Sequence, residues 1–488
     1  MKRLLILSLA ALLAGCSLFP KYQRPEVKTP AEFRGQTAPL DSKSLADLAW
    51  SDLYRDPVLE TLIRTALEQN YDVRIALARI EEFRGAAGIS GLGSIPQISA
   101  GGSAERSRIT TVGPTPLPST SAPVRNTYNA EVDVSYEVDL WRRIANLNVA
   151  TRADLIASEF ARDAVRVSVV ANVASAYFAL RALDQQLAIT VRTVESRAKF
   201  VEMTRAQFER GVVSGLDVNR AEASLATARS VVPDLKAQIA QTENLLEILL
   251  GQNPAPIVRA EAADKFFPAP VEVPTGLPAA LLERRPDLRQ AENTLIGANA
   301  RLKSIKASLY PTISLTGSFG SQSAALSNLF TGPARIWSFG LGVLQPIIDV
   351  NRNKYQVEIY TARERQAILQ YQQAVAQAFR EVSDALAARQ GFTDRLTAQD
   401  EQVAALRSAR EQVGRRYNIG FSSYFEVIDA DTALFNAELT RIAAYQNSLN
   451  ALVQLYKALG GGWQIEADER AGVAGAGGTP QAAPAPAK

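Results

Sequence analysis

Histidine and cysteine, two residue types that often carry out catalysis or bind metals, are almost absent from this chain of 488 residues. The sequence contains no histidine and a single cysteine, Cys16. Histidine is the side chain whose ordinary pKa suits acid–base catalysis near neutral pH, and both residue types are the usual ligands of zinc. No Gly-x-Ser-x-Gly nucleophile elbow and no P-loop occur either. These facts argue against an enzyme, a metal site and an intramolecular disulfide, and we expect no cofactor.

The one cysteine stands at the end of a secretory signal. Lys2-Arg3 precedes an apolar run that ends at Ala14, and Leu13-Ala14-Gly15 leads directly into Cys16. A basic start, a short apolar core and small residues before the cut site are typical of a signal peptide. The pattern resembles a bacterial lipobox, which implies that Cys16 carries the lipid of the mature protein, and Ser17 after it favours the outer membrane. The alternative is an ordinary signal peptide with a chance cysteine.

Charge and hydropathy argue against two further classes of protein. The net charge is +3 and 21% of the residues are charged, so nothing points to a nucleic acid partner. No run of 18 or more apolar residues occurs, and even Val165–Leu183 is interrupted by arginines. A membrane-spanning helix is therefore not predicted.

The second half of the chain repeats the first. At an offset of 209 residues, Phe208-Glu-Arg-Gly211 aligns with Tyr417-Asn-Ile-Gly420, and Leu250-Gly251 aligns with Leu459-Gly460. Upstream of a longer loop in the first copy the offset is 215. A unit of about 210 residues is too long for a short solenoid repeat, so one architectural half is used twice. In chain order we expect a signal peptide (1–15), a lipidated linker and strap (16–50), a first repeat (51–251, with a helix, a β-hairpin at 95–138 and a helical hairpin at 143–251), a proline-rich strap (252–276), a second repeat (277–460, with a helix, a β-hairpin at 310–348 and a helical hairpin at 352–460) and a flexible Gly/Ala/Pro tail (461–488).

Each repeat changes its hydrophobic period after a proline, Pro96 or Pro311, toward which the preceding helix is expected to run. In the following segments apolar and polar residues alternate over roughly ten positions, which is typical of an outer-membrane barrel wall. A soluble antiparallel sheet is the alternative. The polar face carries Glu131, Asp133 and Glu137, which could bias a pore toward cations or, as we favour, simply wet its lumen. Four strands cannot close in lipid, so the barrel interpretation requires several subunits to share one barrel.

The helical hairpins are unusually long. Apolar residues recur at steps of three and four from Arg143 to Arg210 and again from Arg352 to Tyr417. About 65 helical residues extend roughly 100 Å, which predicts a rod or a stave of a tube.

These features together resemble the TolC/OprM family of outer-membrane efflux ducts, in its lipoprotein branch. The motifs that carry the resemblance are the lipobox, Trp50-x-x-Leu-Tyr-x-Asp-Pro57, Tyr136-Glu-Val-Asp-Leu-Trp141, Glu283-Arg-Arg-Pro-Asp287, Tyr310-Pro311, Tyr417-x-x-Gly420 and Val427-Ile-Asp429-Ala430. The resemblance implies a mainly α-helical homotrimer with a twelve-strand barrel in the outer membrane of a Gram-negative bacterium and a periplasmic α-barrel. It also implies a periplasmic adaptor, an inner-membrane pump of the RND class, and passive conduction of drugs or small solutes. The alternatives are a type I protein secretion duct and a lipid-anchored scaffold without a pore.

The same resemblance implies a periplasmic gate at the helix tips. An apolar constriction maps onto Phe425, an acidic ring onto Asp429 and a second acidic position onto Glu426. Ser423-x-x-Glu426 is also a capping box, so we favour the cap for Glu426 and the gate for Asp429. If three Asp429 carboxylates meet around the threefold axis, their repulsion raises their pKa values, and we expect opening to depend on pH and cations.

The resemblance further implies a link between Asp217 and Tyr417 that holds the tips closed. Relatives complete this link with an arginine where this chain has Ser422, so the link is expected to be weaker or to use Arg210 or Arg415-Arg416. The adaptor is expected to contact the tips at Gly211, Val212, Val213, Ser214, Gly215, Gly420, Phe421, Ser422 and Ser423.

Overall fold

The computed structural model describes residues 19–36, 44–54, 56–110, 112, 122–259, 274–276, 278–345, 347 and 350–461. The predicted signal peptide, Cys16 and nearly all of the predicted tail lie outside them. The chain divides into unit 1 (1–26, 79–158 and 290–371) and unit 2 (27–78, 159–289 and 372–488), which are treated separately below. The elements are η1 (Leu45–Asp47), α2 (Trp50–Tyr54), α3 (Pro57–Gln69), α4 (Tyr71–Leu92), β1 (Gln97–Arg108), β2 (Val124–Glu137), α5 (Arg143–Glu209), α6 (Gly215–Leu249), η2 (Pro278–Ala280), α7 (Leu281–Arg284), α8 (Pro286–Ala307), β3 (Thr312–Ser323), η3 (Leu326–Asn328), η4 (Gly332–Ala334), β4 (Arg335–Leu344), α9 (Val350–Asn418) and α10 (Tyr424–Ala458).

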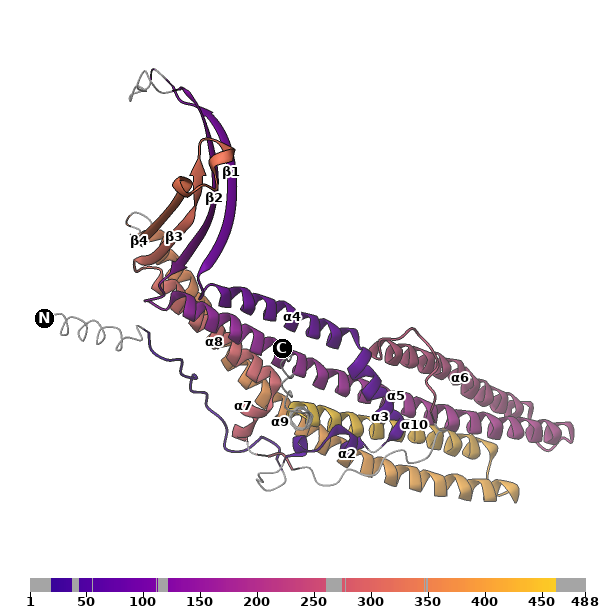
Figure 1. Cartoon of the computed structure of the whole chain (residues 1–488). Helices are drawn as coiled ribbons and strands as arrows, with labels where there is room; N and C mark the ends of the chain where they lie inside the picture. Colours follow the sequence, from indigo (N-terminus) through magenta and orange to yellow (C-terminus); the bar gives the residue numbers. More distant parts are fainter. Residues whose placement is uncertain are drawn as a thin grey trace, which may run out of the picture. The chain divides into compact units, whose positions relative to one another are not determined.

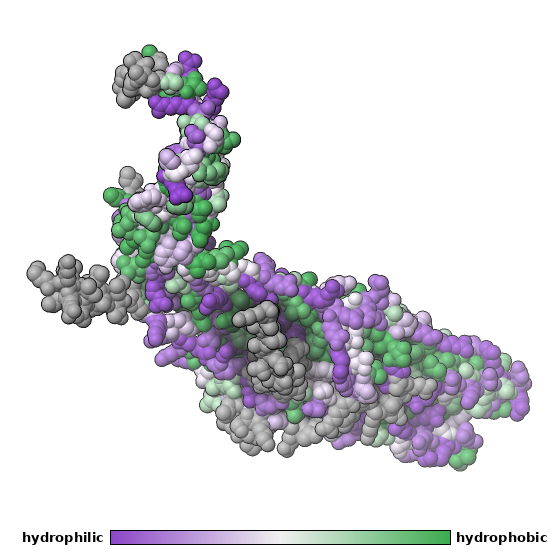
Figure 2. Space-filling view, viewed as in Figure 1, coloured by the Kyte–Doolittle hydropathy of each residue, from purple (hydrophilic) through white to green (hydrophobic). Residues whose placement is uncertain are grey.

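Unit 1 contains a curved antiparallel sheet in the order β1-β2-β3-β4 (Figure 1). Its register places side chains of one kind in rows across the sheet, because residues two apart on a strand share a face. One row is Ala100, Val132, Phe319 and Trp337. The adjacent residue on each strand lies on the other face and belongs to a polar row, Ser99, Asp133, Ser318 and Ser338. Large apolar side chains such as Phe339 (84% exposed) therefore stand on an open face, and hydrophobic residues gather visibly on the sheet in Figure 2. The predicted alternation is confirmed.

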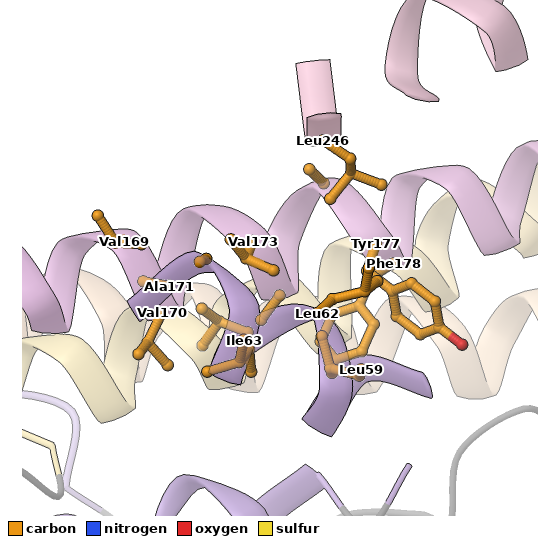
Figure 3. Close-up of a cluster of buried hydrophobic side chains, with 14 of the residues drawn as sticks. Leu59, Leu62, Ile63, Val169, Val170, Ala171, Val173, Tyr177, Phe178 and Leu246 are labelled. Atoms are coloured by element: carbon orange, nitrogen blue, oxygen red, sulfur yellow. The ribbon is translucent and has the colours of Figure 1, made fainter. Parts of the chain in front are cut away.

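The core of unit 2 forms where α3 lies against the long helix α5. The largest cluster of buried side chains joins these helices with α6, as Figure 3 shows. Its labelled members are Leu59, Leu62, Ile63, Val169, Val170, Ala171, Val173, Tyr177, Phe178 and Leu246. Each valine, leucine, isoleucine or phenylalanine side chain among them contributes about 1.5–3 kcal/mol through burial. By length and composition α5 could cross a membrane, with a window of mean hydropathy 1.2, but 56% of that window is buried. Packing therefore accounts for the hydropathy of α5.

The two repeats end their helical hairpins in the same way. Asn70 donates its side-chain amide to the carbonyl of Leu249 (2.8 Å), and Arg285, at the equivalent position (285 − 70 = 215), donates to the carbonyl of Ala458 (3.0 Å). Both residues satisfy carbonyls that a helix end leaves free. The expectation of one helix running unbroken to Pro96 was wrong, because the chain leaves helical geometry at Asn70 and separates α3 from α4.

Candidate functional site

The tips of both helical hairpins lie in unit 2 and share one turn geometry. Gly211 (φ 73°) and Gly420 (φ 80°) adopt the left-handed conformation that glycine tolerates best. The amide of Val212 donates to the carbonyl of Gln207, and that of Phe421 donates to Arg416, both at 2.9 Å. Each turn is therefore a Schellman motif, which ends the first helix and satisfies its last carbonyls.

The second helix of each hairpin begins with an acidic cap. At one tip the carboxylate of Asp217 accepts hydrogen bonds from the backbone amide (3.1 Å) and hydroxyl (2.8 Å) of Ser214. At the other, Glu426 accepts from the amide and hydroxyl of Ser423, both at 3.2 Å. The bond from the Ser423 amide lowers the pKa of Glu426. The capping interpretation of Glu426 therefore describes its contacts, and Asp217 has the same role.

The expected bond between Asp217 and Tyr417 is absent from the described residues of this chain. The Tyr417 hydroxyl donates instead to the side-chain oxygen of Gln207 (3.0 Å). Its ring packs with those of Phe200 (6.4 Å between centroids) and Tyr424 (6.0 Å). Burial, and secondarily the charge of Asp217, raise the pKa of Tyr417. The two residues therefore influence each other electrostatically, but the capping geometry directs the Asp217 carboxylate to its own helix start.

The arginines considered for that link are engaged elsewhere or show no such contact. Arg416 donates to the carbonyl of Phe421 (3.2 Å), within its own turn. Arg415 lies 4.0 Å from Glu411 one helical turn away. No bond from Arg210 to either member of the link occurs among the residues that the structure describes. Within one chain, then, the tip is held by caps and aromatic packing.

Phe425 and Asp429 occupy neighbouring turns on the exposed face of α10. Phe425 is 56% exposed, and the guanidinium carbon of Arg220 lies 5.4 Å from its ring centroid. Asp429 is also exposed, and it forms no hydrogen bond or ion pair with another described residue. The repeat relates these residues, since 429 − 209 = 220 and 425 − 209 = 216. The first tip thus presents Leu216 and Arg220 where the second presents Phe425 and Asp429, a correspondence that the sequence analysis missed although the offset predicts it.

Both tips expose apolar side chains at equivalent positions. Val212 and Phe421 are 70% and 74% exposed, and Leu216 and Phe425 form the second equivalent pair. Exposed apolar groups gathered at one end of a protein are typical of a surface that contacts a partner. The predicted contact residues Val213, Ser214, Gly215, Ser422 and Ser423 lie in or beside the same turns.

Above the tip, a charged contact joins the first hairpin to the second. Arg197 of α5 is almost fully buried and donates to the Asp431 carboxylate of α10 (2.9 Å) and to the carbonyl of Ser224 (2.9 Å). Arg410 of α9 lies 3.6 Å from the other oxygen of Asp431. Sequence reasoning missed this pair because its members are 234 residues apart and no short motif contains both.

A groove of about 430 Å³ lies beside this contact, between α5 and α9. Its walls carry Lys199, Arg410 and Arg415 against a single acid, Glu411, together with apolar Phe200. Basic side chains therefore outnumber acidic ones in the lining, although Arg410 and Arg415 also lie 3.6 Å and 4.0 Å from Asp431 and Glu411. Among the residues that the structure describes, no group of histidine, cysteine and acidic side chains could hold a metal ion.

The three acids predicted to line the lumen share the polar face of β2 but not the same surroundings. Glu131 accepts a hydrogen bond from the side-chain amide of Asn129 (2.7 Å). Asp133 lies between Ser99 and Ser318 in the register. Glu137 forms a bidentate ion pair with Arg143 (2.9 and 2.7 Å), so its charge is balanced within the chain. Only the first two remain as candidates for an unbalanced acidic face.

Residues 62–252 and 277–461 match the family described as outer membrane efflux protein. The toluene efflux pump outer membrane protein TtgC of Pseudomonas putida is 35% identical over 470 residues, which cover 95% of this chain and 96% of that protein. The cation efflux system protein CusC of Escherichia coli is 32% identical over 470 residues, covering 95% and 99%. The structure of the outer-membrane channel OprN superimposes with a TM-score of 0.85 at 28% identity, covering 92% of this chain and all of that one.

Proteins of this family are not enzymes but trimeric outer-membrane channels that work with tripartite efflux pumps. Their fold combines a shared β-barrel with an α-barrel, so the four strands found here account for a third of a barrel of 3 × 4 = 12 strands. A scaffold without a pore, one of the alternatives, is thereby ruled out. The duplicated chain belongs to the outer membrane efflux protein family, and it is an outer-membrane channel of a tripartite efflux system.

Proposed function

We propose that this channel conducts drugs or other small solutes delivered by an inner-membrane pump of the RND class through a periplasmic adaptor. Two relatives of similar identity are named for unlike cargoes, toluene and cations. Cargoes that differ in charge and polarity cannot share one complementary binding site, so selection resides in the pump. Both are small, which favours solute efflux over protein secretion.

The gate of this channel is assigned to Phe425 and Asp429. This assignment is supported by the different contacts of the three acids at the tip. Asp217 and Glu426 are engaged in capping their helices, whereas the exposed carboxylate of Asp429 has no bond to another described residue. A carboxylate without a partner at a tip is available to neighbouring copies around the threefold axis, where like charges raise each other's pKa.

The adaptor is assigned to the exposed apolar residues of both tips and to the basic groove beside them. Val212 and Phe421 provide apolar contact area, and Lys199 provides charge for an acidic partner. Charge reversal in the groove, for example Lys199→Glu, is therefore expected to weaken adaptor binding in a salt-dependent manner. Pull-down of the detergent-solubilised trimer at two ionic strengths measures this, and Lys236→Glu on the exposed face of α6 serves as the control.

Single-channel conductance in planar bilayers tests the gate. The wild-type trimer is expected to give small or flickering currents, and Asp429→Ala and Phe425→Ala to give large and steady ones. Glu426→Gln is the matched control, because it alters an acid of the same turn that is engaged in capping. If all four proteins conduct equally, the pore remains but the gate lies elsewhere. A wild-type current that does not change with pH would refute the proposal that the Asp429 carboxylates interact around the threefold axis.

The covalent lipid on Cys16 is proposed from the lipobox alone, since this residue lies outside the described part of the chain. Metabolic labelling with palmitate is expected to mark the wild type and to leave Cys16→Ser unlabelled. A labelled Cys16→Ser protein would refute the assignment.

A further inference from the structure

A cavity in unit 1 collects three cations beside the first described residues of the chain. It measures about 250 Å³ and is lined by residues 19–22, by the start of α5 and by one face of α8. Its cationic members are Lys21, Arg142 and Lys303, and its remaining walls are largely apolar, with Phe19, Val149 and Ile296 among them. A concave site with apolar walls and a few convergent charges is the usual form of a small-ligand pocket.

The positive charge of this cavity is only partly offset within the described chain, because Glu364 is the acid whose charge acts on Lys303. No hydrogen bond or ion pair joins the side chains of Lys21, Arg142 or Lys303 to another described residue. The nearby acids have other partners, since Glu292 receives a bidentate pair of bonds from Arg24 (2.6 Å each) and Glu364 accepts from Asn299. Burial lowers the pKa of Lys303, although the charge of Glu364 acts in the opposite sense.

The backbone of Arg142 is held in an unfavourable conformation. Arg142 is the one residue other than glycine with a positive φ (60°) in the part of the chain that the structure describes. A left-handed conformation costs such a residue roughly 1–2 kcal/mol. Two hydrogen bonds from the start of α5 to the Asp139 carboxylate, from Ile144 (3.0 Å) and Ala145 (2.7 Å), fix the turn. The turn therefore orients an arginine into the cavity at a position where glycine would be less strained.

The cavity lies at the level where the strands of unit 1 give way to helices. Trp141, the residue before Arg142, stacks on Tyr310 (5.0 Å between centroids), and its indole donates to the carbonyl of Pro311 (2.8 Å). Tryptophan and tyrosine concentrate at membrane–water interfaces, at the depth of the lipid headgroups. Because this chain is an outer-membrane channel, a cation one residue beyond that pair lies where phosphates of the inner leaflet are found.

We propose that Lys21, Arg142 and Lys303 form a binding site for the phosphate of an anionic glycerophospholipid, with the apolar walls against its glycerol and upper acyl chains. Basic pockets at this depth bind anionic headgroups in membrane proteins. The proposed lipid on Cys16 strengthens the argument, since Phe19 is three positions after Cys16, a distance of at most about 10 Å. The assignment of the gate is not needed for this site.

Native mass spectrometry of the full-length trimer with phosphatidylglycerol in detergent tests the proposal. The wild type is expected to retain up to one phosphatidylglycerol per subunit. Each cation near a membrane surface adds about 1 kcal/mol, or about fivefold, so Arg142→Gly with Lys303→Gln should weaken binding by about 25-fold. Lys306→Gln, on the same helix but outside the cavity lining, is the matched control and should change binding less than twofold.

The variants are chosen so that misfolding cannot imitate the result. Glycine adopts the backbone conformation of Arg142 without strain, so Arg142→Gly should preserve the trimer, which its heat-modifiable migration on gels verifies. Equal retention by the wild type and the double variant would overturn the proposal, as would an equal loss in Lys306→Gln. Inorganic phosphate is titrated in parallel, and binding of phosphate without the lipid would identify a free anion as the ligand. Conductance of the same proteins reports separately on the channel.

Discussion

Removing the Asp431 carboxylate should loosen the two helical hairpins from each other near the tip. The Arg197 side chain is only 7% exposed, and its guanidinium donates to Asp431, to the carbonyl of Ser224 and, at 3.4 Å, to the hydroxyl of Thr432. In Asp431→Ala this buried charge loses its counter-ion. Breaking one side of a buried ion pair costs about 3–5 kcal/mol, whereas the half-exposed Arg410 contact adds at most about 1 kcal/mol. We therefore expect a loss of about 3 kcal/mol.

A matched double variant separates loss of the pair from loss of the residues. Arg197→Met with Asp431→Leu removes both charges and keeps similar side-chain volume, so it should lie within about 1 kcal/mol of the wild type. Arg410→Ala removes only the more exposed partner and should have a small effect. This order, with the single variant worse than the double, is specific to a buried charge pair.

Trypsin cleavage at the tip measures the effect, because Arg210, Arg415 and Arg416 flank the turns. When opening is fast relative to cleavage, the cleavage rate follows the population of the opened tip. A loss of 3 kcal/mol should raise that rate by about two orders of magnitude in Asp431→Ala. Conductance should rise in the same variant. If Asp431→Ala and the double variant were cleaved at the same rate, the pair would not hold the hairpins together and the reasoning would be refuted.

Three further predictions test the fold. A Cβ on Gly251 (φ 73°) would lie 2.3 Å from a backbone oxygen of α3, whereas a Cβ on Gly211 (φ 73°) would meet nothing within 4 Å. Gly251→Ala should therefore lower the melting temperature much more than Gly211→Ala. Equal losses in melting temperature would contradict this. Burial and the charge of the neighbouring Glu243 raise the pKa of Glu247 in the folded protein. The ionised carboxylate therefore destabilises the fold as pH rises above about 4.3, the ordinary pKa of a glutamate. Glu247→Gln should raise the melting temperature at neutral pH, and this gain should vanish toward pH 4. A lower melting temperature would instead indicate a cationic partner on another subunit. Phe339→Lys should prevent insertion of the trimer, because a lysine on the lipid-facing side of a strand costs about 2–4 kcal/mol per subunit. Ser338→Lys, on the opposite face of β4, should insert and shift the ion selectivity. Identical behaviour of the two variants would contradict the assignment of the faces.

Local periodicity was enough to predict the strands and the long helices, because both depend on residues close in the sequence. The alternation from Tyr128 to Tyr136 favoured a membrane-spanning sheet over a soluble one, and four strands in lipid required neighbouring subunits. Contacts between distant residues could not be predicted in this way. Nothing in the local pattern indicates that Tyr417 donates to Gln207 or that Arg197 pairs with Asp431, since each contact joins different helices.

Comparison of the two copies within this one chain separates structural from functional residues at the tips. The left-handed glycines and the serine–acid caps occur in both copies, as a helical hairpin of this geometry needs them wherever it stands. One turn further on, the copies differ in charge, with Arg220 in the first and Asp429 in the second. Neither residue caps a helix and both are exposed, with the Arg220 guanidinium over the Phe425 ring, so the backbone does not dictate the choice. In the proposed gate, Arg220 of one tip attracts Asp429 of a neighbouring tip, and this attraction offsets the repulsion among the three Asp429 carboxylates. Reversal of Asp429 to arginine should therefore replace attraction with repulsion and open the channel more than Asp429→Ala does, which conductance would reveal.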